Sequence, residues 1–414
     1  MSAWEHLDAL TRRFEHRSST TAHERAAARW LADRLRQLGY QVGEHPFQAP
    51  RETLYTGPPL VGGAILLLAW LLERLPSPWS WLALVGAGAA LVPLMGELLG
   101  SGPNLDLILP LRPSQNVEAI RPAAAPARRT LVITAHYDTQ RASPLFAPWF
   151  RPLVRPFLTL AYGAILGVPL AMLLRLAAPE LGWVAPVLRG LMGLLAATMG
   201  FLLVCKGLAR DINGANDNGS GTAIALALAE RMAPAGTGGA ASGAEETSIP
   251  VPDDVEVRFL FTGSEEVGLR GMAAWMKGPG RELLPGTVFI NLDNLGGGQL
   301  RFMTSEGMLI PFAADRGLVE LARELAAELR AETGRELLSA WEPLHYLPTD
   351  ALIPIRKGFP AITFIGRDER GQIPNYHWVS DTLDQLDPAH IGDVEMVLAR
   401  YVARVLTARP APEA

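Results

Sequence analysis

The sequence predicts an α/β protein: a three-layer sandwich with a mixed, largely parallel central sheet, interrupted by two inserted hydrophobic α-hairpins. Short runs of β-branched and aromatic residues alternate with helical patterns along most of the chain, which is typical of α/β folds. Four long apolar blocks occur in two pairs. Hydrophobic residues make up 49% of the 414 residues and charged residues only 19%, so some segments are not expected to face water.

The first 39 residues predict two amphipathic packing helices. Charges occur throughout this stretch, so it does not resemble a secretory signal peptide. Apolar residues such as Leu7, Leu10, Trp30 and Leu31 recur at helical spacing, and Gly39 is a suitable residue to end the second helix. We therefore expect no signal sequence here.

The four apolar blocks predict two membrane hairpins. They run from about residue 59 to 72, 79 to 99, 157 to 174 and 181 to 205. A membrane-spanning helix needs about 20 apolar residues. The second and third blocks qualify, the first is short, and the fourth contains Arg189. Four transmembrane helices are expected, and hairpins that lie in the membrane interface or form a dimer contact are the alternative.

The positions of the basic residues predict the orientation of the hairpins. Two hairpins cross a membrane an even number of times, so the segments before, between and after them lie on one side. Five basic residues flank the hairpins on that side, against three in or near the turns; the two groups are Arg51, Arg151, Arg155, Lys206 and Arg210, and Arg74, Arg175 and Arg189. Because positive charge favours the cytoplasmic face, we expect a multi-pass membrane protein with the rest of its chain in the cytoplasm.

Outside the hairpins, four runs predict strands of one sheet: residues 130–135, 255–262, 287–292 and 361–365. Helical patterns lie near residues 221–232 and 318–332. The stretch 233–254 is rich in Ala, Gly, Ser and Pro and is expected to be a surface loop.

Polar side chains follow each predicted strand. His136 and Asp138 follow the first strand, Glu265 and Glu266 the second, and Asp293 the third. A loop after the fourth strand leads to His377, and Asp217 lies in a glycine-rich turn before a helix. Because ligands collect beyond the carboxyl ends of strands in open α/β sheets, we expect these side chains to meet at one edge.

The residue types favour a metal site. Cys205 is the only cysteine, which excludes disulfides within the chain and thiolate metal clusters, so a metal would be held by His, Asp and Glu. Two zinc ions need a carboxylate between them, and Asp217 on its tight turn suits that position. The net charge of −5 and the lack of basic runs exclude nucleic acid as an expected partner.

The paired glutamates and Asp138 suggest further roles. Glu265 and Glu266 leave a strand as neighbours and therefore point in different directions, so one can bind a metal while the other acts as a general base. Asp138 is placed to accept the second N–H of the His136 imidazole. Each motif alone is more typical of a turn or a solvated surface. Their joint occurrence at strand ends is much more specific.

Five stretches resemble the clan MH co-catalytic zinc peptidases, which include bacterial leucyl aminopeptidases, glutamate carboxypeptidase and glutaminyl cyclase. They read LVITAHYDT, NGANDNGSGTA, FLFTGSEEVGLRG, VFINLDNLG and NYHWVSDTLDQLD. The similarity covers roughly residues 1–58, 110–140 and 206–405, which leaves the hairpins as insertions.

The resemblance implies a membrane-anchored, two-zinc aminopeptidase that acts on peptides. One zinc would be held by His136 and Asp293 and the other by Glu266 and His377, with Asp217 between them. Cobalt or manganese would suit the same ligands. The resemblance further implies that Glu265 takes a proton from a bridging water that attacks the peptide carbonyl, and that Asp138 orients His136.

The implied catalytic domain consists of residues 1–58, 101–156 and 206–414, with transmembrane hairpins at 59–100 and 157–205. Two other functions stay open: a glutaminyl cyclase-like acyltransferase with a single zinc, and a non-catalytic membrane scaffold. His345 and Tyr346 lie in a stretch that resembles a substrate-side loop of the family. Either residue could stabilise an oxyanion. It is equally expected that both lie at the rim of the site and have no catalytic role.

Overall fold

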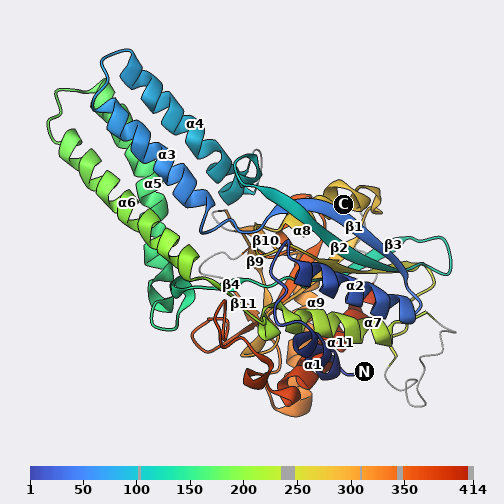
Figure 1. The fold of residues 1–414 in the computed structure, drawn as a ribbon. Coiled ribbons are helices and arrows are strands. Elements are labelled where there is room, and N and C mark those ends of the chain that lie inside the picture. Colours follow the sequence, from blue (N-terminus) through green and yellow to red (C-terminus); the bar gives the residue numbers. More distant parts are fainter. Residues whose placement is uncertain (101–103, 235–247, 308–309, 343–347, 409–414) are drawn as a thin grey trace. The chain divides into compact units, whose positions relative to one another are not determined.

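The computed structural model describes residues 1–100, 104–234, 248–307, 310–342 and 348–408. The chain divides into two compact units (Figure 1). The first contains Met1–Ala49, Arg112–Arg141 and Asp211–Ala414, and the second contains Pro50–Leu111 and Ala142–Arg210. Two segments of the second unit are therefore inserted into the sequence of the first. The functional boundaries at residues 58, 100, 156 and 205 stay a prediction.

An eight-stranded sheet forms the middle of the first unit. Its strands run in the order β1 (Gln41–Pro50), β2 (Leu111–Arg121), β6 (Val255–Thr262), β3 (Arg129–His136), β7 (Val288–Asp293), β12 (Ala361–Arg367), β8 (Gln299–Met303) and β11 (Ser339–Trp341). β3 is parallel to β6 and β7, β12 to β7, and β11 to β8, whereas β2 and β8 are antiparallel to β6 and β12. The predicted mixed, largely parallel sheet is confirmed.

Helices cover both faces of this sheet, and β3 therefore buries residues on both sides. Leu131 and Ile133 belong to the larger core, to which five helices contribute: α1 (Ala3–Arg13), α2 (Ala22–Gln37), α7 (Gly221–Arg231), α9 (Arg316–Thr333) and α11 (Pro388–Thr407). Val132 points to the other face and packs with Trp275 of α8 (Arg270–Lys277), near α10 (Leu352–Arg356). Alternate strand residues face opposite sides of a sheet, which explains this division.

Polar side chains cap the starts of the two amino-terminal helices. Ser2 accepts a hydrogen bond from the backbone of Glu5, whose side chain accepts one from the backbone of Ser2 in return. Thr21 caps α2 by accepting from the backbone N–H of Glu24. Each cap satisfies N–H groups that the first turn of a helix leaves without partners. The two expected packing helices are confirmed.

Short elements complete the described chain. β4 (Arg141–Ala142) pairs with β5 (Arg210–Asp211), and β9 (Ser305–Glu306) with β10 (Phe312–Ala313). One-turn helices occur at Leu105–Leu107, Pro144–Phe146, Arg151–Leu153, Pro279–Glu282 and Leu383–Gln385, and a wider turn at Ala215–Ser220.

The second unit is built around four apolar helices. α3 (Gly57–Leu72) packs against α4 (Trp79–Leu99), and α5 (Val154–Ala177) against α6 (Val184–Leu208) (Figure 1). The two hairpins share one core that includes Ile65, Ala87, Ile165 and Leu195. The outer helix surfaces carry many exposed leucines and valines.

The expectation of four transmembrane helices is wrong in number. Among the described residues, three helices are long and apolar enough to cross a membrane: Trp79–Leu99, Arg151–Ala177 and Val184–Leu208. α3 has only 16 residues. At 1.5 Å per residue it is about 24 Å long, which is less than the hydrocarbon thickness of about 30 Å.

Candidate metal centre

The carboxyl ends of the strands bring the predicted ligands together. β3 ends at His136 and β7 at Asp293, and the parallel register places His136 beside Thr262, the last residue of β6. Glu266 lies in the loop that follows β6. Since parallel strands end at the same edge of a sheet, side chains distant in sequence converge there.

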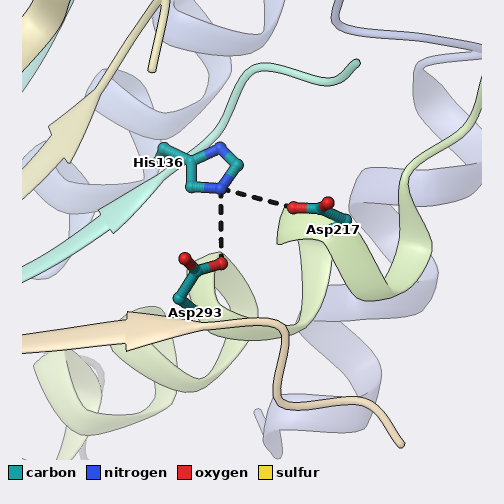
Figure 2. Close-up of side chains that lie close together, drawn as sticks. All are labelled: His136, Asp217 and Asp293. Carbon is teal, nitrogen blue, oxygen red and sulfur yellow. Dashed lines mark ion pairs between the residues drawn. The ribbon is translucent and has the colours of Figure 1, made fainter. Parts of the chain in front are cut away.

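The first cluster consists of His136, Asp217 and Asp293 (Figure 2). Nε2 of His136 lies 3.4 Å from Oδ1 of Asp217 and 3.4 Å from Oδ1 of Asp293. Figure 2 shows the imidazole between the two carboxylates, one from the end of β7 and the other from the turn that precedes α7. All three residues are buried.

The second cluster consists of His377, Asp217 and Glu266. Nε2 of His377 lies 3.1 Å from Oδ2 of Asp217 and 3.2 Å from Oε2 of Glu266. Asp217 therefore presents a different oxygen to each histidine. It is the one residue shared by the two clusters.

Both clusters fit zinc. Two atoms bound tetrahedrally to one zinc ion at about 2.0–2.1 Å lie about 3.4 Å apart, which is close to the His136 and His377 separations. Oδ2 of Asp217 and Oε1 of Glu266 are buried and accept no hydrogen bond from the described part of the chain. Buried carboxylate oxygens without such bonds are costly unless a cation faces them. The chemistry of the donor set thus suits a pair of divalent ions.

Glycines allow the Asp217 turn to approach its neighbours. Gly214 has a φ of 65°, which favours glycine, and a Cβ there would lie 2.3 Å from Cγ2 of Thr139. A Cβ at Gly221 would lie 2.4 Å from both Oδ1 of Asn218 and the carbonyl oxygen of Leu292. Glycine at position 221 therefore lets this turn lie against the carbonyl oxygen of Leu292 at the end of β7, next to Asp293.

The adjacent glutamates after β6 point to different places. Glu266 faces His377, whereas Oε2 of Glu265 lies 3.9 Å from Nε2 of His136 and belongs to neither cluster. Burial raises the pKa of Glu265 well above its ordinary value, and the negative charges of Glu266, Asp350 and Asp293 act in the same direction. Glu265 thus lies beside the candidate metal ligands, and its carboxylate has an increased affinity for a proton.

Comparison with known proteins finds one matching family model. Residues 199–402 match the sequence model of peptidase family M28. This part of the chain therefore resembles peptidase family M28. The match confirms the resemblance to clan MH and, at the level of the family, the prediction of a zinc peptidase. No curated protein sequence matches the chain significantly.

Solved structures share the fold with this chain at low identity. The zinc aminopeptidase BSAP from Bacillus subtilis is 17% identical with a TM-score of 0.55, over 99% of this chain and 96% of that chain. Glutaminyl cyclase from Porphyromonas gingivalis is 16% identical with a TM-score of 0.53, over 98% and 97%. A zinc-dependent exopeptidase from Parabacteroides distasonis is 13% identical with a TM-score of 0.52, over 99% and 97%. These comparisons lend no support to membrane insertion.

The candidate ligand residues also shift one another's pKa values. Burial alone would lower the pKa of His377, but the carboxylates of Glu266 and Asp217 raise it to about 10. The pKa of His136 is likewise raised, against the effect of burial, by the carboxylates of Glu265, Asp138, Asp217 and Asp293. Burial would raise the pKa of Asp217, yet its contacts with the imidazoles of His136 and His377 hold this pKa well below its ordinary value. Without metal, the imidazoles therefore retain protons that a bound cation would displace.

The structure places the Asp138 carboxylate differently from the sequence-based expectation. Nδ1 of His136 lies 3.2 Å from the backbone carbonyl oxygen of Asp138 and 3.6 Å from its Oδ1. The carboxylate instead accepts hydrogen bonds from Ser19 Oγ and from the backbone N–H groups of Glu265 and Glu266. Asp138 thus reaches His136 through its main chain. Its function in catalysis stays a prediction.

Three buried residues near the site escaped the sequence analysis. Asp381 accepts from the backbone of Asn216 and Asp217, and Arg17 donates to three carbonyl oxygens around the same turn. Asp350 accepts a hydrogen bond from Thr262. Asp381 lies four residues after His377 in a motif already recognised, which was an available signal. His345 and Tyr346 lie outside the described residues.

Proposed function

We propose that the chain is a membrane-anchored two-zinc exopeptidase that removes amino-terminal residues from peptides. The observation that carries this proposal is the position of Asp217, whose two oxygens face two different histidines at 3.4 and 3.1 Å. A carboxylate placed in this way suits two ions that share it, as two-metal hydrolysis requires. His136 and Asp293 would complete one ion site, and Glu266 and His377 the other.

The protein's own residues would handle the proton. When bound, the two ions would supply Lewis acidity that activates a water and polarises the peptide carbonyl. Glu265 is free to act as general base because it belongs to neither ligand cluster and lies close to both His136 and Glu266. The raised pKa of Glu265 favours its taking a proton from the water and delivering it to the departing amine.

The single-zinc acyltransferase is the second candidate, because the fold is also that of a glutaminyl cyclase. Two complete ligand clusters favour the peptidase, since one ion would leave one cluster without a cation. The complete set of ligand residues also argues against a non-catalytic scaffold. The number of bound metals separates the first two functions.

Metal analysis combined with a substrate panel tests the enzyme proposal. We expect about two zinc ions per chain, and hydrolysis of aminoacyl anilides that chelators abolish and added zinc restores. Amino-terminally acetylated substrates should not be cleaved, because an aminopeptidase recognises the free amine. About one zinc and cyclisation of peptides that begin with glutamine would instead favour the acyltransferase. Cleavage of internal bonds in acetylated peptides would contradict both.

Two polar contacts between the hairpins support membrane anchoring. At one end of the bundle, Nε of Arg189 on α6 lies 3.4 Å from Oε1 of Glu73 at the end of α3. At the other end, Lys206 of α6 contacts Thr56, which precedes α3, and lies 3.7 Å from Glu52. Neither α3 nor the part of α6 between Arg189 and Lys206 contains a charged residue.

The distance between these contacts is close to the thickness of a thin bilayer. Seventeen residue steps separate Arg189 from Lys206. At 1.5 Å per residue this is about 26 Å, against about 27–30 Å of hydrocarbon in cellular membranes. Exposed tryptophans gather near the turns of the hairpins, as in an interfacial aromatic belt: Trp70, Trp79, Trp81 and Trp183.

Labelling of introduced cysteines tests the topology, because Cys205 is the only native cysteine and is buried. We propose that the first unit faces the cytoplasm. A membrane-impermeant maleimide should then label Leu75→Cys, in the turn of the first hairpin, on intact cells. Glu282→Cys in the first unit should be labelled only after the membrane is opened. Labelling of Glu282→Cys alone on intact cells would reverse the orientation, and equal labelling of both would contradict the anchor.

A further inference from the structure

Two aspartates outside the ligand set hold the loops that carry the ligands. The carboxylate of Asp138 accepts the backbone N–H groups of Glu265 and Glu266, at 3.0 and 3.3 Å. The carboxylate of Asp381 accepts those of Asn216 and Asp217, at 2.6 and 3.0 Å. In both cases the two carboxylate oxygens accept hydrogen bonds from the backbone N–H groups of two consecutive residues, one bond to each oxygen. Both aspartates are fully buried.

The two contacts run between different ligand segments. Asp138 follows His136 of the first cluster and binds the loop of Glu266, which belongs to the second cluster. Asp381 follows His377 of the second cluster and binds the turn of Asp217, which belongs to both. The segment that carries each histidine also carries an aspartate. This aspartate binds a loop whose own carboxylate belongs to the second cluster. A shift of either segment would be transmitted to that carboxylate.

Arg17 connects these two contacts. Its guanidinium donates to the carbonyl oxygens of Tyr137, Asn213 and Gly214, at 2.7, 2.8 and 2.8 Å. It thereby joins the main chain just before Asp138 to the turn that carries Asp217. Its positive charge also attracts Asp138 and Asp381, so the buried carboxylates face a buried cation.

The order of segments along the chain explains the need for such contacts. The second apolar hairpin separates His136 from Asp217 in sequence, so chain continuity does not hold these two ligand residues together. Loss of residues that orient metal ligands lowers metal affinity by about 10- to 100-fold. Hydrogen bonds from backbone N–H groups to charged acceptors are among the stronger ones and have defined directions.

We propose that Asp138 and Asp381 are paired positioning residues that set the separation of the two metal positions, with Asp381 orienting the shared ligand Asp217. This inference rests on the proposed two-metal site but not on the identity of the substrate. Asp381 acts through Asp217 and should affect both ions. Asp138 acts through Glu266 and Glu265 and should affect the second ion and the general base.

Cobalt titration of the full chain tests the proposal without peptide hydrolysis. In Asp381→Asn, an amide group replaces one acceptor oxygen at nearly constant size. We expect its affinity for both cobalt ions to fall at least tenfold and the visible absorption of bound cobalt to change. Asp138→Asn should weaken mainly one ion. Asp384→Asn is the matched control, since Asp384 lies on the same segment but is exposed and bonds only to neighbouring residues.

Hydrogen exchange of the wild-type chain covers the case in which a variant does not fold. The N–H groups of Asn216, Asp217, Glu265 and Glu266 should be protected in the metal-free protein, because each is bonded to a buried carboxylate. Fast exchange of these groups would overturn the proposal, as would a folded Asp381→Asn variant with wild-type cobalt affinity and spectrum. Failure to bind any cobalt in the wild type would contradict the two-metal site itself, and binding of two ions without peptidase activity would contradict only the proposed reaction.

Discussion

Oδ2 of Asp217 lies 3.1 Å from Nε2 of His377, while its other carboxylate oxygen faces His136. One side chain thereby joins two clusters that come from distant parts of the chain. This arrangement, together with the free Glu265 beside it, leads to predictions for the metals, the proton and the fold.

Replacing Glu265 with glutamine should reduce kcat by about 10²–10⁴-fold while zinc content is retained. The amide cannot take a proton, and Glu265 belongs to neither ligand cluster. Steady-state kinetics and elemental analysis on the same preparation measure both effects. Glu282→Gln, at an exposed position of the first unit, is the control and should leave kcat unchanged. Normal turnover of Glu265→Gln would reject the assigned base.

The shared ligand should matter more for metal content than an unshared one. Asp217→Asn should lose both zinc ions, whereas Asp293→Asn should keep about one, because only Asp217 belongs to both clusters. Mass spectrometry of the native protein counts the ions per chain. If Asp217→Asn retained two ions, the bridge would be disproved.

Zinc binding should release protons and become tighter as pH rises. In the metal-free protein the pKa of His377 is raised to about 10 and that of Glu266, through burial, to about 7. Groups with raised pKa values keep their protons at neutral pH, and zinc must displace them. Titration calorimetry between pH 6 and 8, in buffers with different ionisation enthalpies, counts the released protons. A zinc affinity that fell with rising pH would contradict this prediction.

The same shift at His377 predicts how the metal-free fold depends on pH. A folded-state pKa of about 10, against an ordinary value of 6.5, stabilises the fold fully below pH 6.5. This contribution is lost as pH rises through about 10. Urea unfolding of metal-free wild type and His377→Gln at pH 6 and 9 measures it, and the difference between the two proteins should be larger at pH 6.

A charge on the outer face of α5 should prevent membrane integration. Leu166 is 46% exposed near the middle of this helix, whereas Leu107 is 68% exposed outside the four helices. Arginine at the centre of a membrane helix costs about 2.5–3.5 kcal/mol on the insertion scale. Leu166→Arg should therefore be released from membranes at alkaline pH, and Leu107→Arg should stay in them. If both variants stayed, the outer face of α5 would not face lipid.

A methyl group at Gly221 should disturb the metal centre, since its Cβ would lie 2.4 Å from the carbonyl oxygen of Leu292. Gly221→Ala should lower both the melting temperature and the zinc content. Gly392→Ala is the matched control on α11, where a Cβ meets nothing within 4 Å. That change should be neutral or stabilise the fold by up to about 1 kcal/mol. Equal effects of the two substitutions would argue against a specific role for the Gly221 turn.

Much of the sheet was predictable because its strands are marked by local composition. The run expected at 255–262 coincides with β6, and that at 130–135 lies within β3. The lengths of the apolar helices were harder to predict. Block lengths alone suggested four spans, but α3 ends at Glu73 after 16 residues, and its pairing with Arg189 of α6 becomes visible only in the packed bundle.

Residue type and spacing along the chain were enough to indicate the α/β class, the candidate ligands and the pair of glutamates, because strand periodicity and strand ends are local properties. The assembled fold was needed to determine which carboxylate oxygen faces which imidazole, and that Asp381 and Arg17 support the site. These relations join residues more than a hundred positions apart, such as Arg17 and Asn213, and their geometry depends on how strands and helices pack. No local pattern carries that information.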